Sequence, residues 1–361
     1  MKYLLLLFVT FFNYTTFCQP FDKFDSLAKI IPDSISKSPE SFAKYLSDKF
    51  QTEDKIVRAL YVWLATNISY DLDKYDSILS LGGYYSTNQD LISGTLKHKK
   101  GVCENYAAIF ERICNLCGIQ SFVVTGYTRE FGKLQTKLGH AWNVAEIDHS
   151  WYLFDPTWGA GYIRFERFHK KFSFDYYMAN PDSFIKTHMP FDPIWQLKEF
   201  PITHKDFISD TITSSILINF CDSIVHYNQL PKYLRVKSSF NRAEINGLKQ
   251  PELEFFYSQQ KEYSIKCLDY YYYQQYNTAV EEFNKAIDEY NKYIYNKKRG
   301  VKNTNQNEIF ESINYKINNS KEILKNIKTG VVRETDIDRL RDEISKFEKQ
   351  LNSIKISQKQ K

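Results

Sequence analysis

Apolar residues recur at helical spacing over residues 39–69. The segment SPESFAKYLSDKF offers Ser38 as a candidate N-cap before Pro39, and proline is favoured at the first helical position. The segment EDKIVRALYVWLATNISYD carries an apolar stripe formed by Ile56, Ala59, Leu60, Trp63 and Leu64. Residues 71–93 show no clear period and include two adjacent glycines, so we expect a loop there.

Another helix is predicted to begin at Cys103 and to end at Gly118, because glycine is common just past a helix C-terminus. Its apolar stripe consists of Tyr106, Ile109, Phe110, Ile113, Cys114 and Cys117. The next segment, IQSFVVTGYTRE, is rich in β-branched and aromatic residues and predicts a strand. The segment GHAWNVAEIDHSWYLFDPTW predicts a hairpin with its turn near Asp148–Ser150.

The pattern changes after about Ser209. Long helices are predicted over Pro251–Lys298, Glu308–Lys328 and Glu334–Lys355, with polar breaks between them. We therefore expect an α+β domain over residues 19–208, with a helix packed on an antiparallel sheet. A mostly α-helical domain is expected over residues 209–361.

Composition narrows the range of partners. The chain has 361 residues, 43% hydrophobic and 25% charged, which is typical of globular domains. A net charge of +5 is too small to indicate a nucleic-acid partner. The excess lies in residues 297–361, where 16 Lys and Arg face 9 Asp and Glu. We interpret these charges as a solvated helix surface, the alternative being weak contact with an anionic surface.

The N-terminal segment MKYLLLLFVTFFNYTTFCQP has the features of a secretory signal. Its apolar run, Tyr3–Phe12, is shorter than the roughly 20 residues that span a bilayer. Residues 1–18 are therefore interpreted as a signal peptide, which predicts a secreted or periplasmic protein. The alternative is a lipid anchor on Cys18. Five cysteines remain after cleavage, an odd number, so this is not a disulfide-stapled scaffold.

Cys103 is the candidate nucleophile. It follows a glycine-containing turn at a helix start, where partial positive charge and unpaired N–H groups favour a thiolate. Cys114 and Cys117 form a C-x-x-C, but both fall within the predicted helix on its apolar stripe. We interpret them as buried core residues, because redox pairs place their first cysteine at a helix N-terminus.

A thiolate nucleophile needs an imidazole beside it and a third group to orient the imidazole. His140 and Asp155 lie on the two strands of the predicted hairpin. If Glu146 pairs with Trp151, His140 and Asp155 become diagonal neighbours on one face, whereas a one-residue slip would separate them. Tryptophans flank this pair and are expected to exclude water, namely Trp142, Trp151 and Trp158, of which Trp142 and Trp158 are also candidate substrate contacts.

Three segments, GVCENYAAIFERIC, GHAWNVAEIDHSWYLFDPTWG and YYMANPDSFIKTHMPFDPIWQL, resemble the transglutaminase-like superfamily of papain-type cysteine enzymes. The last segment is similar to the branch that includes the kyphoscoliosis peptidase. The resemblance covers about Pro39 to Leu197. It implies a papain/transglutaminase-like core with Cys103 as nucleophile, His140 as base and Asp155 as its orienter.

The resemblance further implies an enzyme that hydrolyses or transfers amide bonds of proteins or peptides through an acyl-thioester. The alternative is a catalytically idle module that binds a peptide or protein. No cofactor or metal is expected, because Asp71, Asp73 and Asp76 are interpreted as a solvated loop rather than a calcium site. His188, in the tail motif, is expected to brace the fold, with substrate contact as the alternative, and His149 to be exposed in the hairpin turn.

Overall fold

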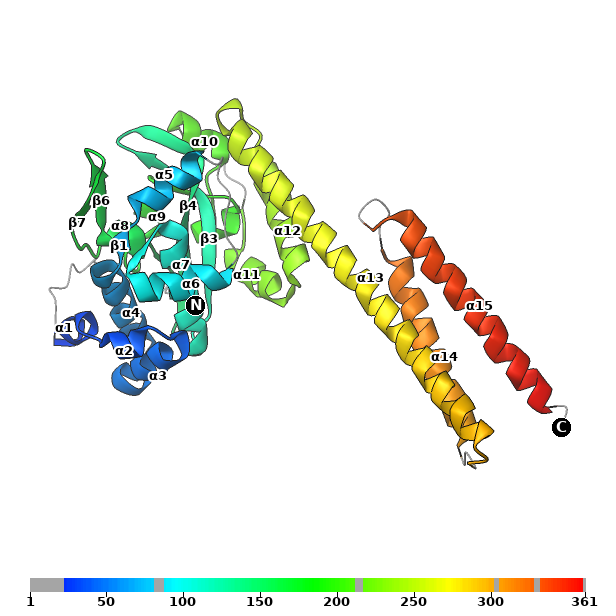
Figure 1. Ribbon diagram of the computed structural model, residues 1–361. Helices are drawn as coiled ribbons and strands as arrows, with labels where there is room; N and C mark the ends of the chain where they lie inside the picture. Colours follow the sequence, from blue (N-terminus) through cyan, green and yellow to red (C-terminus); the bar gives the residue numbers. More distant parts are fainter. Residues whose placement is uncertain (1–22, 81–87, 212–216, 302–304, 328–331, 360–361) are drawn as a thin grey trace, which may run out of the picture. The chain divides into compact units, whose positions relative to one another are not determined.

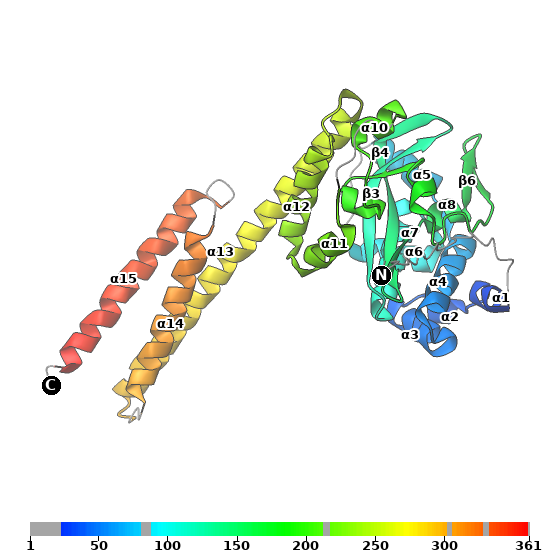
Figure 2. The ribbon, with the colours of Figure 1, turned by 180° about the vertical axis from the view of Figure 1, so that it is seen from behind.

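The computed structural model describes residues 23–80, 88–211, 217–301, 305–327 and 332–359 (Figures 1 and 2). The predicted signal peptide and Cys18 lie outside these ranges. The chain divides into two compact units, the first ending at Gln229 and including Ser238–Ser258, the second formed by Leu230–Lys237 and Gln259–Lys361. The boundary predicted at residues 208–209 stays a prediction.

The first unit is built around three helices, α3 (Pro39–Phe50), α4 (Glu53–Asn67) and α7 (Cys103–Leu116). The Ser38 hydroxyl accepts the N–H of Ser41, as the predicted N-cap requires. Helix α4 is buried on nearly every side rather than along one stripe, because other elements surround it. Two short helices, α1 (Lys23–Lys29) and α2 (Asp33–Ser36), precede α3.

An antiparallel sheet with strand order β5-β4-β3-β8 packs against α7. Its strands are β3 (Ser121–Glu130), β4 (Lys133–Ile147), β5 (Ser150–Phe154) and β8 (His188–Pro190). Glu146 pairs with Trp151, which is the register that His140 and Asp155 need in order to share a face. The β4–β5 turn contains two residues with positive φ, Asp148 at 48° and His149 at 62°, a geometry that suits two-residue hairpins. His149 is exposed there, as predicted.

Two predictions for this unit were wrong. The loop predicted over residues 71–93 is wrong for the residues that the structure describes, because helix α5 (Leu72–Ser80) lies in this segment and helix α6 (Asn88–His98) begins in it. Helix α6 lacks a clear pattern in the sequence, yet it is fixed by hydrogen bonds from Asn105 of α7. The strand carrying His140 begins at Lys133 rather than at His140, because β3 and β4 already pair as a hairpin before a register shift in β3.

The remaining elements of the first unit are short. Parallel strands β1 (Ser69–Tyr70) and β2 (Lys100–Gly101) precede α7, and the hairpin β6 (Gly161–Arg164) and β7 (Arg167–Lys170) follows α8 (Pro156–Ala160). The division between the two units falls within α12 (Lys232–Ile245), after Lys237. The other helices are α9 (Pro181–Phe184), η1 (Pro193–Gln196), α10 (His204–Ser209), α11 (Phe220–Gln229) and η2 (Pro251–Leu253).

The second unit is helical, as predicted. It contains most of α13 (Glu254–Lys298), together with α14 (Gln306–Lys325) and α15 (Glu334–Lys359). These helices share a buried core that includes Phe283, Tyr290, Ile313, Ile317, Leu340 and Ile344. Within the described ranges, no helix is both long enough and apolar enough to cross a bilayer.

Candidate active site

Cys103 occupies the first position of helix α7. Val102 precedes the helix and has no side chain that could cap it, so Asn105 does so instead: its Oδ1 accepts the Val102 N–H at 2.9 Å. The Asn105 amide donates to the Leu91 carbonyl at 2.9 Å and to the Thr95 hydroxyl at 2.8 Å. This buried network fixes the start of the helix, and with it Cys103.

The turn before Cys103 requires glycine. Gly101 pairs with Tyr70, and its carbonyl accepts the Asp71 N–H at 3.1 Å. A Cβ at Gly101 would lie 2.6 Å from the Asn105 Cβ, closer than atoms of a side chain can approach. The glycine of the Gly-Val-Cys motif therefore allows the capping residue to pack against the turn.

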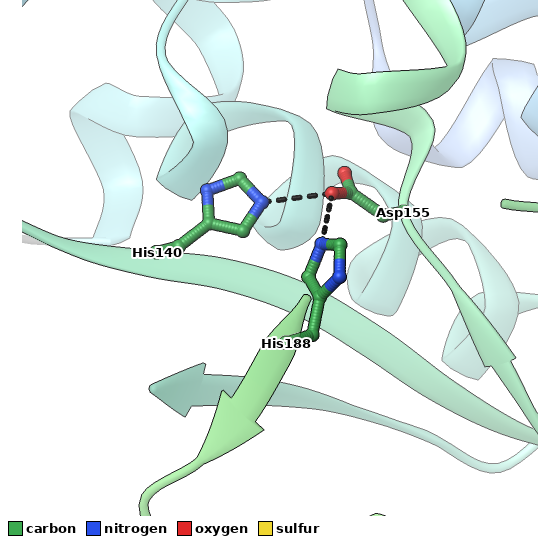
Figure 3. Close-up of side chains that lie close together, drawn as sticks. All are labelled: His140, Asp155 and His188. Atoms are coloured by element: carbon green, nitrogen blue, oxygen red, sulfur yellow. Dashed lines mark hydrogen bonds and ion pairs between the residues drawn. The ribbon is translucent and has the colours of Figure 1, made fainter. Parts of the chain in front are cut away.

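His140 and Asp155 face each other across β4 and the end of β5 (Figure 3). The distance from His140 Nε2 to Asp155 Oδ2 is 2.7 Å, and Asp155 is fully buried. Asp155 is also the N-cap of α8, where its Oδ1 accepts the backbone N–H groups of Thr157 at 2.8 Å and Trp158 at 3.1 Å. The Asp-Pro sequence thus both ends a strand and begins a helix, which holds the carboxylate in one orientation.

These contacts decide the charge of the pair. Burial alone would raise the pKa of Asp155, but the charge and hydrogen bonds of His140 and His188 hold it well below its usual range. Burial alone would lower the pKa of His140, but Asp155 and the Cys103 side chain raise it to about 10. An ionised carboxylate and a protonated imidazole are therefore the stable forms near neutral pH.

Cys103 lies within interaction range of the His140 ring, since its side chain contributes to the raised pKa through a hydrogen bond and through charge. His140 Nε2 is engaged with Asp155, so Nδ1 is the ring nitrogen left for the thiol. The structure thus brings together the three residues Cys103, His140 and Asp155, from the start of α7, from β4 and from the end of β5.

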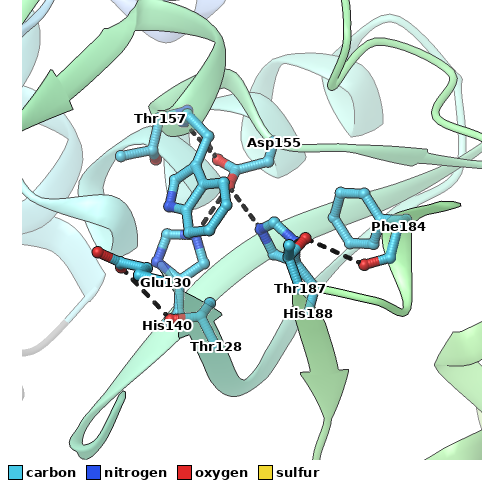
Figure 4. A network of polar contacts seen from close by, with 9 residues as sticks. Thr128, Glu130, His140, Asp155, Thr157, Phe184, Thr187 and His188 are labelled. Carbon is cyan, nitrogen blue, oxygen red and sulfur yellow. Dashed lines mark hydrogen bonds and ion pairs between the residues drawn. The ribbon is translucent and has the colours of Figure 1, made fainter. Parts of the chain in front are cut away.

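A fourth residue joins this group. His188, from β8, places its Nε2 3.2 Å from Asp155 Oδ2, the oxygen that His140 also contacts (Figures 3 and 4). The Thr187 hydroxyl lies 2.8 Å from His188 Nδ1. From the sequence, His188 is expected to brace the fold or to contact substrate, and a bond to Asp155 is not predicted because no periodic pattern relates the two residues. Its place in the tail motif was the only available signal.

The predicted tryptophans lie in three different environments. Trp142 is fully buried beside His140 and His188, with ring centroids at 5.9 and 5.3 Å, so in this structure it packs under the site rather than on its surface. Trp158 is half-buried, 5.8 Å from the His140 ring, and remains a candidate substrate contact. Trp151 does not flank the pair, because it stacks on Phe122 at 5.8 Å.

Phenol and carboxyl groups surround Cys103. Burial, followed by the charge of Cys103, raises the pKa of Tyr70 well above its usual range, so the phenol stays protonated. Burial raises the pKa of Glu104 to about 7, with Lys74 partly offsetting it. Tyr70 and Lys74 were not predicted to lie at the site, because β1 and α5 bring them there only in the folded chain.

One group among the described residues has the composition of a metal site. Ligand atoms of His140, Asp155 and His188 lie within 4.8 Å of one another. Both histidines already point a nitrogen at a single Asp155 oxygen, and the other oxygen accepts two backbone N–H groups. A hydrogen-bonded network accounts for the cluster without a metal. The acidic residue Asp71 instead accepts the Lys74 N–H at the start of α5.

Burial raises the pKa of the other two cysteines of this segment, although a hydrogen bond with Ser47 partly offsets the effect at Cys117. Cys114 is fully buried in the core, and burial raises its pKa well above the usual value. Cys117 is the C-cap residue rather than a residue within the helix, is only half-buried, and lies 3.5 Å from the Ala43 carbonyl. Cys103, Cys114 and Cys117 are all free thiols, as are Cys221 and Cys267.

Comparison with known proteins finds similarity over part of the chain. Residues 40–156 match the family described as "Transglutaminase-like superfamily". The chain is 28% identical over 212 residues to the kyphoscoliosis peptidase of Homo sapiens, covering 56% of this chain and 30% of that protein. It is 22% identical over 218 residues to Hillarin of Drosophila melanogaster, covering 55% of this chain and 26% of that protein.

A solved structure described as "Crystal structure of a TGase" is 21% identical and covers 47% of this chain and 40% of its own, with a TM-score of 0.28. The chain spans less than a third of the length of the two curated relatives. The family match confirms the resemblance that the three sequence motifs predicted.

Proposed function

Residues 40–156 form a transglutaminase-like domain, and from this premise we propose that the chain is a cysteine enzyme acting on amide bonds of proteins or peptides. The observation that carries the proposal is the contact of His140 with both the buried Asp155 carboxylate and the Cys103 side chain. This is the order of groups that a thiolate nucleophile requires, with a carboxylate orienting the imidazole and the imidazole beside a cysteine at a helix start.

The proposed reaction begins with attack of the Cys103 thiolate on an amide carbonyl carbon, which forms a C–S bond. The protonated His140 gives its Nδ1 proton to the departing amine as the C–N bond breaks, leaving an acyl-thioester. Water or a second amine then attacks the thioester carbon and loses a proton to His140. The C–S bond breaks, and the thiolate–imidazolium pair is restored.

The fold supplies two further contributions to this mechanism. Asp155 remains ionised throughout, holds the ring by its Nε2, and stabilises the positive charge on His140. The N-terminus of α7 directs backbone N–H groups toward the region of Cys103, where they favour the thiolate and the oxyanion of the tetrahedral intermediate. The name of the human relative, kyphoscoliosis peptidase, agrees with the hydrolytic form of the reaction.

Alkylation kinetics test the proposal. The purified protein is treated with iodoacetamide between pH 4 and 9, and the rate at each cysteine is followed by peptide mass spectrometry. We expect Cys103 to label rapidly below pH 7, where an ordinary thiol is almost entirely protonated. The exposed Cys221 serves as the internal reference.

The matched variant is His140→Gln, which keeps a polar side chain of similar size but cannot carry the positive charge. It should slow Cys103 labelling at pH 6 by about 100-fold or more and leave Cys221 unchanged. Cys103 labelling that follows the Cys221 profile in the wild-type protein would contradict the proposal and favour the idle binding module.

A further inference from the structure

We propose that His188 is a positioning residue of this site, a hydrogen-bond donor that fixes the Asp155 carboxylate for its contact with His140. The inference rests on the proposed function, because positioning has a consequence for activity only if Cys103 reacts. It adds a fourth residue to Cys103, His140 and Asp155, and it assigns that residue one tautomer and one hydrogen-bond partner on each ring nitrogen.

The surroundings of His188 exclude its charged form. The side chain is fully buried, with the Phe184 ring stacked on it at 4.0 Å and 20° and the Trp158 ring at 4.4 Å. Burial outweighs the attraction of Asp155 and lowers the pKa of His188 to about 4. At neutral pH the ring therefore carries a single proton.

The hydrogen-bond partners of the two ring nitrogens then show which nitrogen carries that proton. Nε2 faces the Asp155 carboxylate oxygen, which has no proton to give, so Nε2 must carry the hydrogen. Nδ1 is consequently an acceptor. The Thr187 hydroxyl lies 2.8 Å from this nitrogen and 3.3 Å from the Phe184 carbonyl, so the shorter contact is the one to His188 (Figure 4). A hydroxyl that donates to Nδ1 favours the tautomer that Asp155 requires.

With this assignment every acceptor site of Asp155 is used. Oδ1 takes the N–H groups of Thr157 and Trp158, and Oδ2 takes one N–H from each histidine. The two histidines have opposite roles. His140 changes its protonation during the proposed reaction, whereas His188 keeps its proton and holds Oδ2 in place while the charge on His140 comes and goes.

A glycine in the central strand β3 allows His188 to lie beside Asp155. β8 is separated from β4 by β3, in which Gly126 lies opposite both His140 and Pro190. A Cβ at Gly126 would meet the Met189 carbonyl at 2.1 Å and the Trp142 Cη2 at 2.6 Å. Because Gly126 has no side chain, the Trp142 ring and the backbone of β8 can pack directly against β3. This close packing places His188 beside Asp155.

The test uses His188→Phe, which keeps an aromatic ring without a donor, and His188→Gln, whose amide can donate to Asp155 and accept from Thr187. The iodoacetamide pH profile of Cys103 is the readout. We expect His188→Phe to slow Cys103 labelling at pH 6 about tenfold. The rise of the labelling rate with pH should then begin about one pH unit higher than in the wild-type protein. His188→Gln should recover most of the rate.

His204→Phe is the matched control for packing. His204 is likewise fully buried with a pKa lowered to about 4, but it contacts Tyr127 and the Phe191 carbonyl rather than Asp155. It should leave the Cys103 profile unchanged. A folded His188→Phe protein that labels like wild type, or a His204→Phe protein slowed equally, would overturn the inference.

A second measurement needs no His188 variant to fold. Two-bond ¹⁵N–¹H correlation spectra of wild-type protein with labelled histidine report the tautomer of each ring, and the His188 signals are assigned through Thr187→Val. A neutral His188 protonated on Nε2 at pH 7 supports the inference, whereas a charged ring or a proton on Nδ1 overturns it. This result stands even if wild-type Cys103 proves unreactive, so the two proposals fail separately.

Discussion

At the scale of single residues, the Asp155 side chain has two roles, one structural and one at the candidate active site. One oxygen caps helix α8 and the other holds two histidines. The cap is a local consequence of the Asp-Pro sequence, but the histidines come from strands 15 and 33 residues away. The same carboxylate therefore links local helix formation to the chemistry of the site.

Asp155→Asn should separate these two roles. Asparagine is as good an N-cap as aspartate, so the cap of α8 should be kept, and any loss of unfolding free energy should come from the broken contacts with His140 and His188. Its amide cannot supply negative charge, so the pKa of His140 should fall from about 10, and Cys103 labelling at pH 6 should drop about 100-fold or more. Urea unfolding and iodoacetamide kinetics on the same preparation measure both.

Asp155→Ala is the comparison for that experiment. It removes the cap as well as the charge, so it should lose labelling to the same degree and also cost about 1 kcal/mol or more of unfolding free energy. If Asp155→Asn retained wild-type labelling, the carboxylate would have no electrostatic role on His140.

At the scale of elements, the site depends on how strands and helices are brought into contact. The N-terminus of α7 is held by Asn105, which reaches α6, and β8 reaches Asp155 across β3. Glycines mark both close approaches, Gly101 beside Asn105 and Gly126 beside Trp142. Each glycine is required by a neighbouring element rather than by its own backbone angles.

Gly126→Ala should damage the sheet at its crowded centre. The new methyl group would lie 2.1 Å from the Met189 carbonyl and 2.8 Å from the Pro190 Cα, so β8 must move. We expect a loss of about 1–3 kcal/mol of unfolding free energy and loss of the His188–Asp155 hydrogen bond. Urea unfolding and the His188 tautomer measure these effects.

Gly94→Ala provides the opposite outcome for comparison. Gly94 lies within α6, and a Cβ there would meet nothing within 4 Å. Alanine should stabilise this helix by roughly 0.5–1 kcal/mol. Equal destabilisation by both substitutions would mean that crowding at Gly126 is not the cause.

At the scale of the whole molecule, the two units differ in how they respond to pH. The first unit contains both buried neutral histidines, His188 and His204, and the His140–Asp155 pair. The chain's five tryptophans also lie in the first unit, so tryptophan fluorescence follows its unfolding alone. The second unit is held by a core of aromatic and aliphatic helix residues.

The stability of the first unit should fall as the pH drops from about 6.5 to 4. Over this range His188 and His204 stay neutral when folded, with pKa values of about 4, but bind protons when unfolded. Each contributes up to about 3 kcal/mol that is present above pH 6.5 and lost toward pH 4. Urea titrations followed by tryptophan fluorescence at several pH values measure this slope.

The opposite sign applies to His140. Its folded pKa of about 10 lies above the unfolded value, so its contribution is complete below pH 6.5 and is lost as the pH rises toward 10. Stability should therefore be greatest near pH 6.5. His149→Asn, in the exposed turn, should leave the profile unchanged, whereas His204→Phe should flatten its acid side. A profile that stays flat from pH 6.5 to 4 in the wild-type protein would contradict this assignment.

The sequence by itself determined the elements and residues whose pattern is local. The pattern of the β4–β5 hairpin predicted two strands that carry His140 and Asp155, although the structure had to supply their register, and the glycine turn before a helical stripe singled out Cys103. The helical character of the C-terminal region followed from its periodicity. In each case the information lies within about 15 residues, over which one backbone period relates side chains directly.

Only the tertiary structure decided the rest. Helix α6 exists because Asn105 of another helix bonds to it, and Trp142 became a core residue because Gly126 leaves room above β3. His188 joins the site although it follows Asp155 by 33 residues and lies two strands from His140. Contacts between elements depend on sheet order and close packing, and no periodic pattern along the chain encodes them.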